Sequence, residues 1–238
     1  MEQQLIETDA IRQAMVNAGW DMDIELTANA VETTHLELPR VRIEHMDSGR
    51  HRMYIDSLES YLGADTREIE IPGNKLTAVV FAEQFIRALW TDGEEIPACS
   101  AINNIPVAHE PLSENCRHCE HGVIGGACKP KVRLLLLAEV NGEVRPLIIN
   151  LSPTSIKHWN SHKKKLARSG LPVVAVNTSF ELVDTKRGSY RWAEVSVGMD
   201  SGIAKKEILI MAKKARMQFE ELTKRISDED FSESGDKQ

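Results

Sequence analysis

All four cysteines of this 238-residue chain lie within one stretch of 30 residues. A C-x-x-C pair stands between two more distant partners, and together they are Cys99, Cys116, Cys119 and Cys128. Zinc favours a tetrahedron of thiolate and imidazole ligands, and a C-x-x-C turn supplies two of them. The glycines at positions 122, 125 and 126 would let the backbone fold back between ligands. The spacing therefore predicts one structural zinc ion (Zn2+) held by the four cysteines.

Two other interpretations of the cysteine cluster stay open. His118 and His121 lie in the same loop, and either could replace a cysteine at the metal. Cys116 and Cys119 also have the spacing of a redox-active dithiol. A zinc ion with four protein ligands has no open position for water or substrate, so we expect no catalysis at the metal.

Charge is distributed unevenly along the chain, whose formal net charge is −7. Residues 1–98 carry 19 acidic and 8 basic side chains, a balance of −11. Residues 129–191 carry 12 basic and 4 acidic side chains, a balance of +8. A basic region of this kind favours a polyanionic partner, although many proteins simply have a basic face.

Three basic segments could contact a single-stranded nucleic acid. Cations near 129–133 and on one face of an expected helix at 153–169 could follow a phosphate backbone. Residues 186–192 place aromatics among cations, so that bases could stack while cations meet phosphates. Alternatively, the cations of the helix form an ordinary solvated surface, and the aromatics of residues 186–192 are buried in the core. The predicted nucleic-acid-binding residues are Lys129, Lys131, Arg133, Lys157, Lys163, Lys164, Lys165, Arg168, Lys186, Arg187, Tyr190, Arg191 and Trp192.

The elements before and around the cysteines are expected to be strands and turns. Apolar alternation over 36–43 and 51–55, with a turn at 47–49, predicts a β-hairpin. A buried strand over 76–81 is expected to continue as a short helical segment that ends near Trp90. Residues 91–130 show no periodic apolar pattern, which is unusual in a compact domain and is explained by a module that folds around a metal.

The clearest pattern follows the cysteines. Asn141-Gly142 predicts a tight turn between strands over 132–140 and 144–151. Ser152 and Pro153 indicate the start of a helix, and Gly170 indicates its end. A second hairpin over 173–197 and a helix over 204–226 complete the chain's regular elements.

We therefore expect an α+β fold that is mostly β: a small OB-like barrel with an inserted zinc module and flanking helices. The expected parts are an N-terminal helical extension at 1–34, an OB-like domain at 35–198 with the module at 97–130, a helix at 199–226, and a disordered acidic tail at 227–238.

Over roughly residues 38–198 the chain resembles a family of uncharacterised phage and mobile-element proteins. The markers are Leu-Pro-Arg-Val-Arg-Ile at 38–43, Ala-Leu-Trp at 88–90, Cys99-Ser100, the C-x-x-C pair, Cys-Lys-Pro at 128–130 and Leu-Ser-Pro-Thr-Ser at 151–155. Members of this family resemble zinc-containing single-stranded DNA-binding proteins encoded near recombination genes. The resemblance implies zinc at the four cysteines and DNA on the basic segments, and it assigns no individual DNA-contacting residue.

These observations favour a non-catalytic single-stranded DNA-binding protein of phage or mobile-element replication or recombination. Its acidic tail would recruit replication or recombination proteins. The alternative is a zinc-containing adaptor that binds and redirects a host protein, a polymerase or a nuclease. A nuclease is disfavoured because the carboxylates at Glu68 and Glu70 lack the lysine that usually accompanies them.

The sequence also predicts where the protein works. No leader-like segment and no apolar run of membrane-spanning length is evident, so we expect a cytoplasmic protein without a membrane partner. A homo-oligomer is left open, as is the preference between DNA and RNA.

Overall fold

The computed structural model divides the chain into two units, residues 1–34 and 35–238. Apart from Asn17, which is helical, the structure describes only parts of the second unit. The helical extension expected at 1–34 (Asn17 excepted), the turn expected at 47–49 and the acidic tail expected at 227–238 lie outside the described residues. The described ranges are 38–45, 51–56, 68–91, 94, 97–108, 110–123, 125–188 and 190–222.

Strands dominate the described residues, as expected. The strands are β1 (Arg40–His45), β2 (His51–Asp56), β3 (Ile69–Glu70), β4 (Lys75–Leu89), β5 (Cys99–Ile102), β6 (Ile105–Pro106), β7 (Lys129–Val140), β8 (Glu143–Leu151), β9 (Val176–Arg187) and β10 (Tyr190–Ile203). The helices are α3 (Pro153–Arg168) and α4 (Lys206–Leu222), with single 3-10 turns η2 (Pro72–Asn74), η3 (Glu120–Gly122) and η4 (Val173–Ala175).

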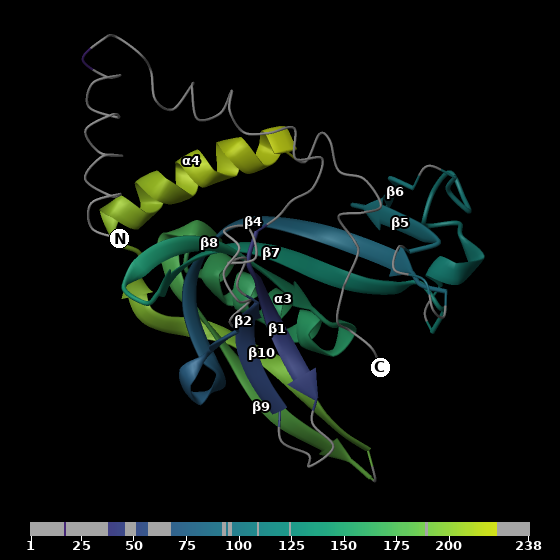
Figure 1. The fold of residues 1–238 in the computed structure, drawn as a ribbon, viewed down its shortest axis with the longest axis horizontal. Coiled ribbons are helices and arrows are strands. Elements are labelled where there is room, and N and C mark those ends of the chain that lie inside the picture. Colours follow the sequence, from purple (N-terminus) through teal and green to yellow (C-terminus); the bar gives the residue numbers. More distant parts are fainter. Residues whose placement is uncertain are drawn as a thin grey trace. The chain divides into compact units, whose positions relative to one another are not determined.

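One curled sheet, a half-barrel, contains all of these strands (Figure 1). Its order is β10-β9-β4-β7-β8-β1-β2-β3, with β5 paired to β4 and β6 paired to β5. Neighbouring strands are antiparallel except β1 and β8, which are parallel. No helix among the described ranges is long and apolar enough to cross a membrane.

The hairpins expected from the sequence are confirmed. β1 pairs with β2, β7 with β8, and β9 with β10. At the β7–β8 turn, Asn141 and Gly142 have φ values of 53° and 83°. Both residues thus adopt the left-handed conformation that a two-residue turn requires to match the twist of its strands.

Two expectations around the cysteines are wrong. The helical segment near Trp90 is instead the second half of β4, which remains a strand to Leu89 because it pairs with β7 on one side and β5 on the other. Residues 91–130, expected to lack regular structure, contain the short β5–β6 hairpin. Backbone pairing with strands that are distant in the sequence outweighs the helix propensity of the residues around Glu83 and Gln84.

The core has two layers, one on each face of the sheet. Because side chains alternate along a strand, β7 supplies Leu134 and Leu136 to the inner layer and Leu135 and Leu137 to the outer one. Trp159 of α3, only 1% exposed, packs into the inner layer. The outer layer packs against α4.

Helix α3 begins where the sequence indicates, with Ser152 at the N-cap position and Pro153 in the first turn. The Ser152 side chain does not cap the helix backbone, however, and its Oγ lies 3.1 Å from the Oγ of Ser155. Ser155 Oγ also accepts a hydrogen bond from the N–H of Val195, which ties α3 to the edge of β10. Helix α4 begins at Lys206, two residues after the expected start, and residues 223–226 of the expected span lie outside the described residues.

Strand β4 pairs with β7 along one edge, and its ladder along the other edge is interrupted. Its residues 75–78 pair with β9 and its residues 86–89 pair with β5. Between these segments, Arg216 of α4 donates a hydrogen bond to the Phe81 carbonyl oxygen at 2.6 Å. The side-chain oxygen of Asn103 accepts one from the Phe85 N–H, and the Asn103 N–H donates to the Phe85 carbonyl. Side chains and a loop therefore replace a strand along this edge.

Candidate nucleic-acid interface and cysteine cluster

The four cysteines meet in one pocket at the end of β4. Cys99 begins β5, Cys128 immediately precedes β7, and Cys116 and Cys119 come from the loop before η3. None of the four forms a disulfide bond. The residues lining the pocket are Leu89, Cys99, Ser100, Ala101, Leu112, Ser113, Cys116, Cys119, His121, Gly122 and Cys128. The fold thus brings together the residues that the spacing selected as zinc ligands.

A glycine is required where this loop folds back on itself. A Cβ at Gly122 would lie 2.7 Å from the Cys116 carbonyl oxygen, closer than Cβ atoms approach in proteins. The loop is also closed by a hydrogen bond from the Cys128 N–H to the His121 carbonyl at 3.0 Å. This hydrogen bond holds the segment after the C-x-x-C pair close to Cys128.

Two thiols of the pocket, those of Cys116 and Cys128, resist ionisation. Burial raises the pKa of Cys116 and of Cys128, and the other cysteines raise both pKa values further by repulsion between thiolates. Arg87 opposes the shift because its positive charge favours the thiolates. Within the described ranges, no group of three or more His, Cys, Asp or Glu side chains is arranged so that it could already hold a metal ion.

The two histidines of the loop differ in position. His121 lines the pocket, and its Nε2 lies 3.5 Å from the Glu120 carboxylate. His118 is exposed and does not line the pocket. If a histidine replaced a cysteine at the metal, His121 would be the better placed of the two.

The predicted binding residues of β7 lie on the outer face of the sheet. Side chains alternate along β7, so Lys129, Lys131 and Arg133 project from the same face as the outer-layer residues Leu135 and Leu137. Further along the strand, this face packs against α4. The register places Lys129 opposite Ala88 and Arg133 opposite Gln84. Arg133 is only 2% exposed, so it contributes positive charge to this face more than direct contact.

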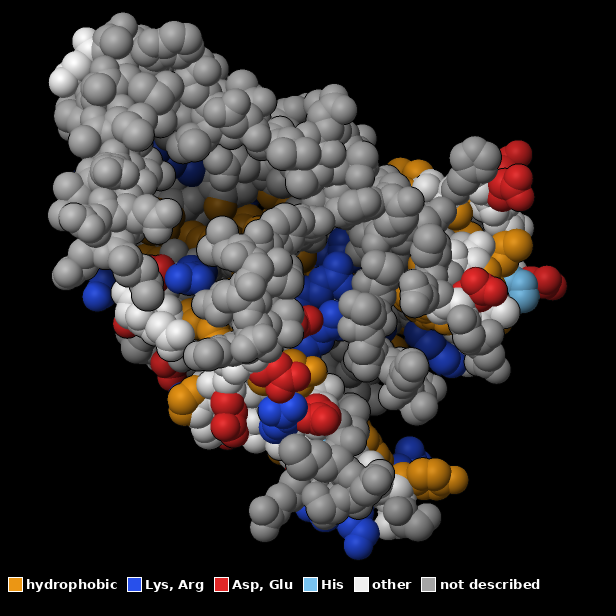
Figure 2. Space-filling view, in the orientation of Figure 1, with side chains coloured by type: hydrophobic (Ala, Val, Ile, Leu, Met, Phe, Trp, Pro, Cys, Tyr) orange, Lys and Arg blue, Asp and Glu red, His pale blue; other side chains and the backbone are white. Residues whose placement is uncertain are grey.

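Strand β1 adds two arginines to the same outer face. Arg40 is the register partner of Ile148, which packs in the outer layer, and Arg42 follows it by two residues. Figure 2 shows Lys and Arg side chains gathered near the middle of this side of the molecule. We use the name basic face for the five residues Arg40, Arg42, Lys129, Lys131 and Arg133.

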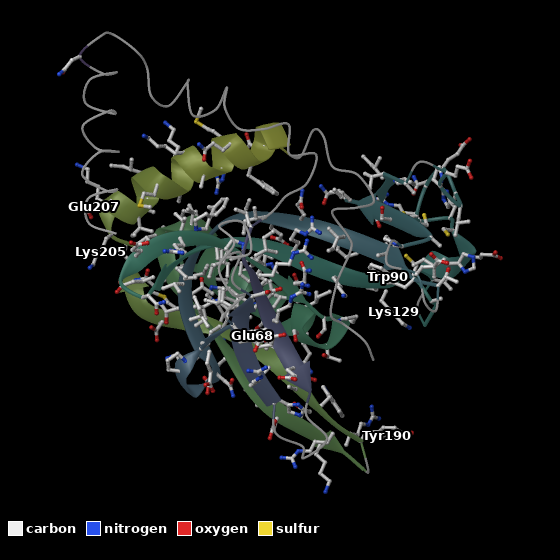
Figure 3. All side chains as sticks on the ribbon, viewed as in Figure 1. Glu68, Trp90, Lys129, Tyr190, Lys205 and Glu207 are labelled. Carbon is white, nitrogen blue, oxygen red and sulfur yellow. The ribbon has the colours of Figure 1, made fainter. Side chains whose placement is uncertain are left out.

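An aromatic side chain borders the basic face. Trp90 follows the last residue of β4 and, by alternation, shares the face of Ala88, the register partner of Lys129. Figure 3 shows Trp90 and Lys129 at the same end of the β4–β7 pair. The Trp90 ring is partly exposed, and no hydrogen bond or ring contact to it is formed by any residue that the structure describes.

The predicted cations of α3 lie elsewhere, because α3 packs through Trp159 against the inner layer. Lys157 forms an ion pair with Glu194 at 2.8 Å, and Lys163 pairs with Glu83 at 2.6 Å. The remaining predicted cations of this helix, Lys164, Lys165 and Arg168, are exposed. Lys157 and Lys163 therefore already hold the helix in place through carboxylates.

The predicted residues at the β9–β10 turn are mostly exposed. Tyr190 is 77% exposed, and Lys186 and Arg187 are exposed beside it. Arg191 pairs with Asp184 at 2.8 Å. In Figure 3, Tyr190 lies at the tip of this hairpin, well apart from Trp90 and Lys129. The structure thus separates the predicted nucleic-acid-binding residues into the outer face of β7, the surface of α3 and the hairpin tip.

Trp192 differs from Tyr190 because it points to a buried carboxylate. Its indole N–H donates a hydrogen bond to Glu194 at 2.9 Å. Burial alone would raise the pKa of the Glu194 carboxyl, but hydrogen bonds from Lys157, His158 and Trp192 lower it to about 2. This network is a structural link between α3 and β10.

Sequence reasoning missed Arg40, Arg42, Trp90 and Arg87 as site residues. The alternation of side chains along 84–90 could have placed Trp90 with Lys129, but the expectation of a helix there concealed it. Arg40 and Arg42 join the face only because β1 pairs in parallel with β8, and no local pattern predicts that pairing.

Comparison with known proteins adds no relative. No family model, curated protein or solved structure matches this chain. The resemblance to phage and mobile-element proteins therefore stays a prediction, and the function is argued from the residues and contacts of the chain itself.

Proposed function

We propose that this protein binds single-stranded DNA across the basic face, without catalysis, and that one structural zinc ion in the cysteine pocket stabilises the module beside that face. The observation that carries the proposal is the position of the cations of β7 on the outer face of a curled sheet, next to Trp90. Phage or mobile-element replication or recombination is the setting we propose for this activity.

The strand order supports an OB-like interpretation of the barrel. Strands β4, β7, β8, β9 and β10 occur in the spatial order β8-β7-β4-β9-β10, with α3 between β8 and β9 in the chain. OB folds are five-stranded Greek-key barrels that bind oligonucleotides on the face of their second and third strands. In this chain those strands are β7 and β8.

The same interpretation accounts for the position of two loops of the chain, one long and one short. In OB folds the binding face is flanked by the loop between the first two strands and the loop between the last two. Here the first loop is the cysteine module and the second is the β9–β10 turn with the exposed Tyr190. Both loops would thus border the nucleic acid.

The chemistry of the basic face suits a single strand. Its cations can neutralise phosphates, and the release of counterions makes such binding strongly dependent on salt. The partly exposed ring of Trp90 offers a stacking surface for a base, which a duplex keeps inside its helix. The aromatic ring of α3, by contrast, belongs to Trp159, which is buried and cannot stack on a base.

The donor set of the pocket fits zinc. Four cysteine thiolates form the usual ligand set of a closed structural site, and a divalent cation would offset the burial and the mutual repulsion that raise the pKa of Cys116 and Cys128. With all four positions filled by protein, the metal would stabilise the module and leave no site for a substrate.

Fluorescence anisotropy of a labelled oligo-dT, compared with a duplex of equal length at several salt concentrations, tests the DNA-binding proposal. We expect tighter binding of the single strand and a log–log salt slope of about −2 to −4, since roughly 0.7 counterions are released per phosphate contact. Protein that contains zinc but binds neither oligonucleotide would overturn the proposal. Such a result would favour an adaptor that binds a host polymerase or nuclease.

A further inference from the structure

Arg87 lies between the sheet and the cysteine pocket. It belongs to β4, where it is the register partner of Pro130 in β7 and of Ala101 in β5. It therefore projects to the face opposite the basic face. Its Nη1 donates a hydrogen bond to the Gly122 carbonyl oxygen at 3.0 Å, and its guanidinium carbon lies 5.3 Å from the centre of the Phe85 ring. These contacts fix the guanidinium against the loop that follows the C-x-x-C pair.

One donor of this guanidinium has no acceptor. The Nε–H of Arg87 is buried and makes no hydrogen bond with any described residue. A buried donor without a partner is destabilising, so the site favours the arrival of an acceptor such as a thiolate. Gly122, which accepts the Arg87 hydrogen bond, and Ala101, its register partner in β5, both line the cysteine pocket, so the guanidinium lies at the wall of that pocket.

A zinc ion bound by four thiolates carries an excess negative charge in a pocket that is lined in part by Leu89, Ala101 and Leu112. A nearby fixed cation lowers the free energy of such a centre, and N–H donors to the sulfurs orient the ligands. Arg87 is such a cation, because its hydrogen bond to the Gly122 carbonyl fixes it beside the pocket.

We propose that Arg87 is a positioning residue of the zinc centre. Its Nε–H donates to a thiolate sulfur of Cys116 or Cys128, its charge offsets that of the thiolates, and its bond to Gly122 holds the loop to β4. The inference rests on the proposed zinc site. Arg87 lies on the same strand as Gln84, the register partner of Arg133, and this strand leads directly to Trp90. Arg87 therefore connects the metal site to the strand that borders the basic face.

The test compares zinc release from the purified full-length wild type, R87M and R87K to the chromogenic chelator 4-(2-pyridylazo)resorcinol. We expect R87M to lose metal affinity by roughly 10- to 100-fold, the usual effect of removing an outer-sphere partner. R87K keeps the charge without the planar Nε–H donor, and we expect it to lie between R87M and the wild type. R145M is the matched control, since Arg145 is exposed and forms an ion pair with Glu143, away from the cysteines.

A second readout separates hydrogen bonding to sulfur from a general loss of packing. In Co2+-substituted protein, we expect the sulfur-to-cobalt charge-transfer band to shift in R87M and to stay unchanged in R145M. A wild type that purifies without zinc and takes up no Co2+ would overturn the zinc site, and this inference with it. A metal-loaded wild type whose R87M variant shows the same release rate and the same band would overturn the role of Arg87 alone.

Discussion

Glu194 accepts a hydrogen bond from the indole N–H of Trp192, two residues earlier on the same strand, at 2.9 Å. The same carboxylate holds Lys157 and His158 of α3. Trp192 is therefore held toward α3 by this bond. Tyr190, at the tip of the hairpin, is 77% exposed, so the two aromatics that looked equivalent in the sequence lie in different surroundings.

The Glu194 network should make stability fall in acid. The pKa of Glu194 is about 2 in the folded protein and near 4.5 in an unfolded chain, so the unfolded state takes up the proton first. The stabilisation is complete above about pH 4.5 and is lost as the pH falls toward 2, by on the order of 1–3 kcal/mol. Urea unfolding at pH 7, 4 and 3 measures this loss.

The matched variant for the pH experiment is E194Q, which cannot ionise. We expect it to be less stable than the wild type at pH 7 and to show a smaller change on acidification. If the wild type and E194Q lost stability in parallel between pH 4.5 and 3, the acid sensitivity would belong to other carboxyls.

Removing charge from the basic face should weaken DNA binding for all sequences alike. Lys129 and Lys131 lie at the start of β7, and replacing both by Ala should reduce the salt slope by roughly 1.4. The control replaces Lys164 and Lys165, exposed cations of α3, by Ala. Anisotropy titrations of both pairs against oligo-dT compare the two surfaces. A larger effect from the α3 pair would move the interface to that helix.

Trp90 should contribute a stacking interaction. Trp90→Ala should cost roughly 1–3 kcal/mol of binding free energy, and Trp90→Phe should retain part of it because a phenyl ring still stacks. The intrinsic fluorescence of the wild type should be quenched by oligo-dT, and W90F should lose most of that quenching. Quenching that survives in W90F but disappears in W192F would assign the stacking residue to the β9–β10 hairpin.

Loss of the C-x-x-C pair should unfold the module. Replacing Cys116 and Cys119 by Ser removes two ligands, and metal binding and folding of such a module are one event. We expect the double variant to purify without zinc and to expose the loop of residues 110–123 to protease. H121A, which alters a pocket residue and keeps all four thiols, is the control and should keep its zinc. Zinc retained by the double variant would disprove the four-cysteine site.

The sequence predicted the elements whose signals are local. Asn141-Gly142, Ser152-Pro153 and Gly170 each fix a turn or a helix end by their own conformational preferences, and each marks the boundary found in the structure. The cysteine spacing likewise predicted four residues that share one pocket.

What the sequence could not predict depends on partners distant in the chain. The strand at 82–89 is stabilised by β5 and β7, and its own residues do not reveal either neighbour. The parallel pairing of β1 with β8 brings Arg40 and Arg42 to the basic face, and ion pairs with Glu83 and Glu194 engage two lysines that looked available. Long-range register and charge pairing therefore decided which cations gather.

The gap in the ladder of β4 bears on solubility as well as on binding. Unpaired backbone groups at a sheet edge can template the addition of a strand from another molecule, which is a route to aggregation. Here Arg216 occupies the Phe81 carbonyl and Asn103 occupies both backbone groups of Phe85. The two residues that cover these backbone groups belong to different parts of the chain: Arg216 to α4 and Asn103 to the cysteine module. Detachment of either element would thus expose a ready edge for self-association, even in protein whose barrel core is intact.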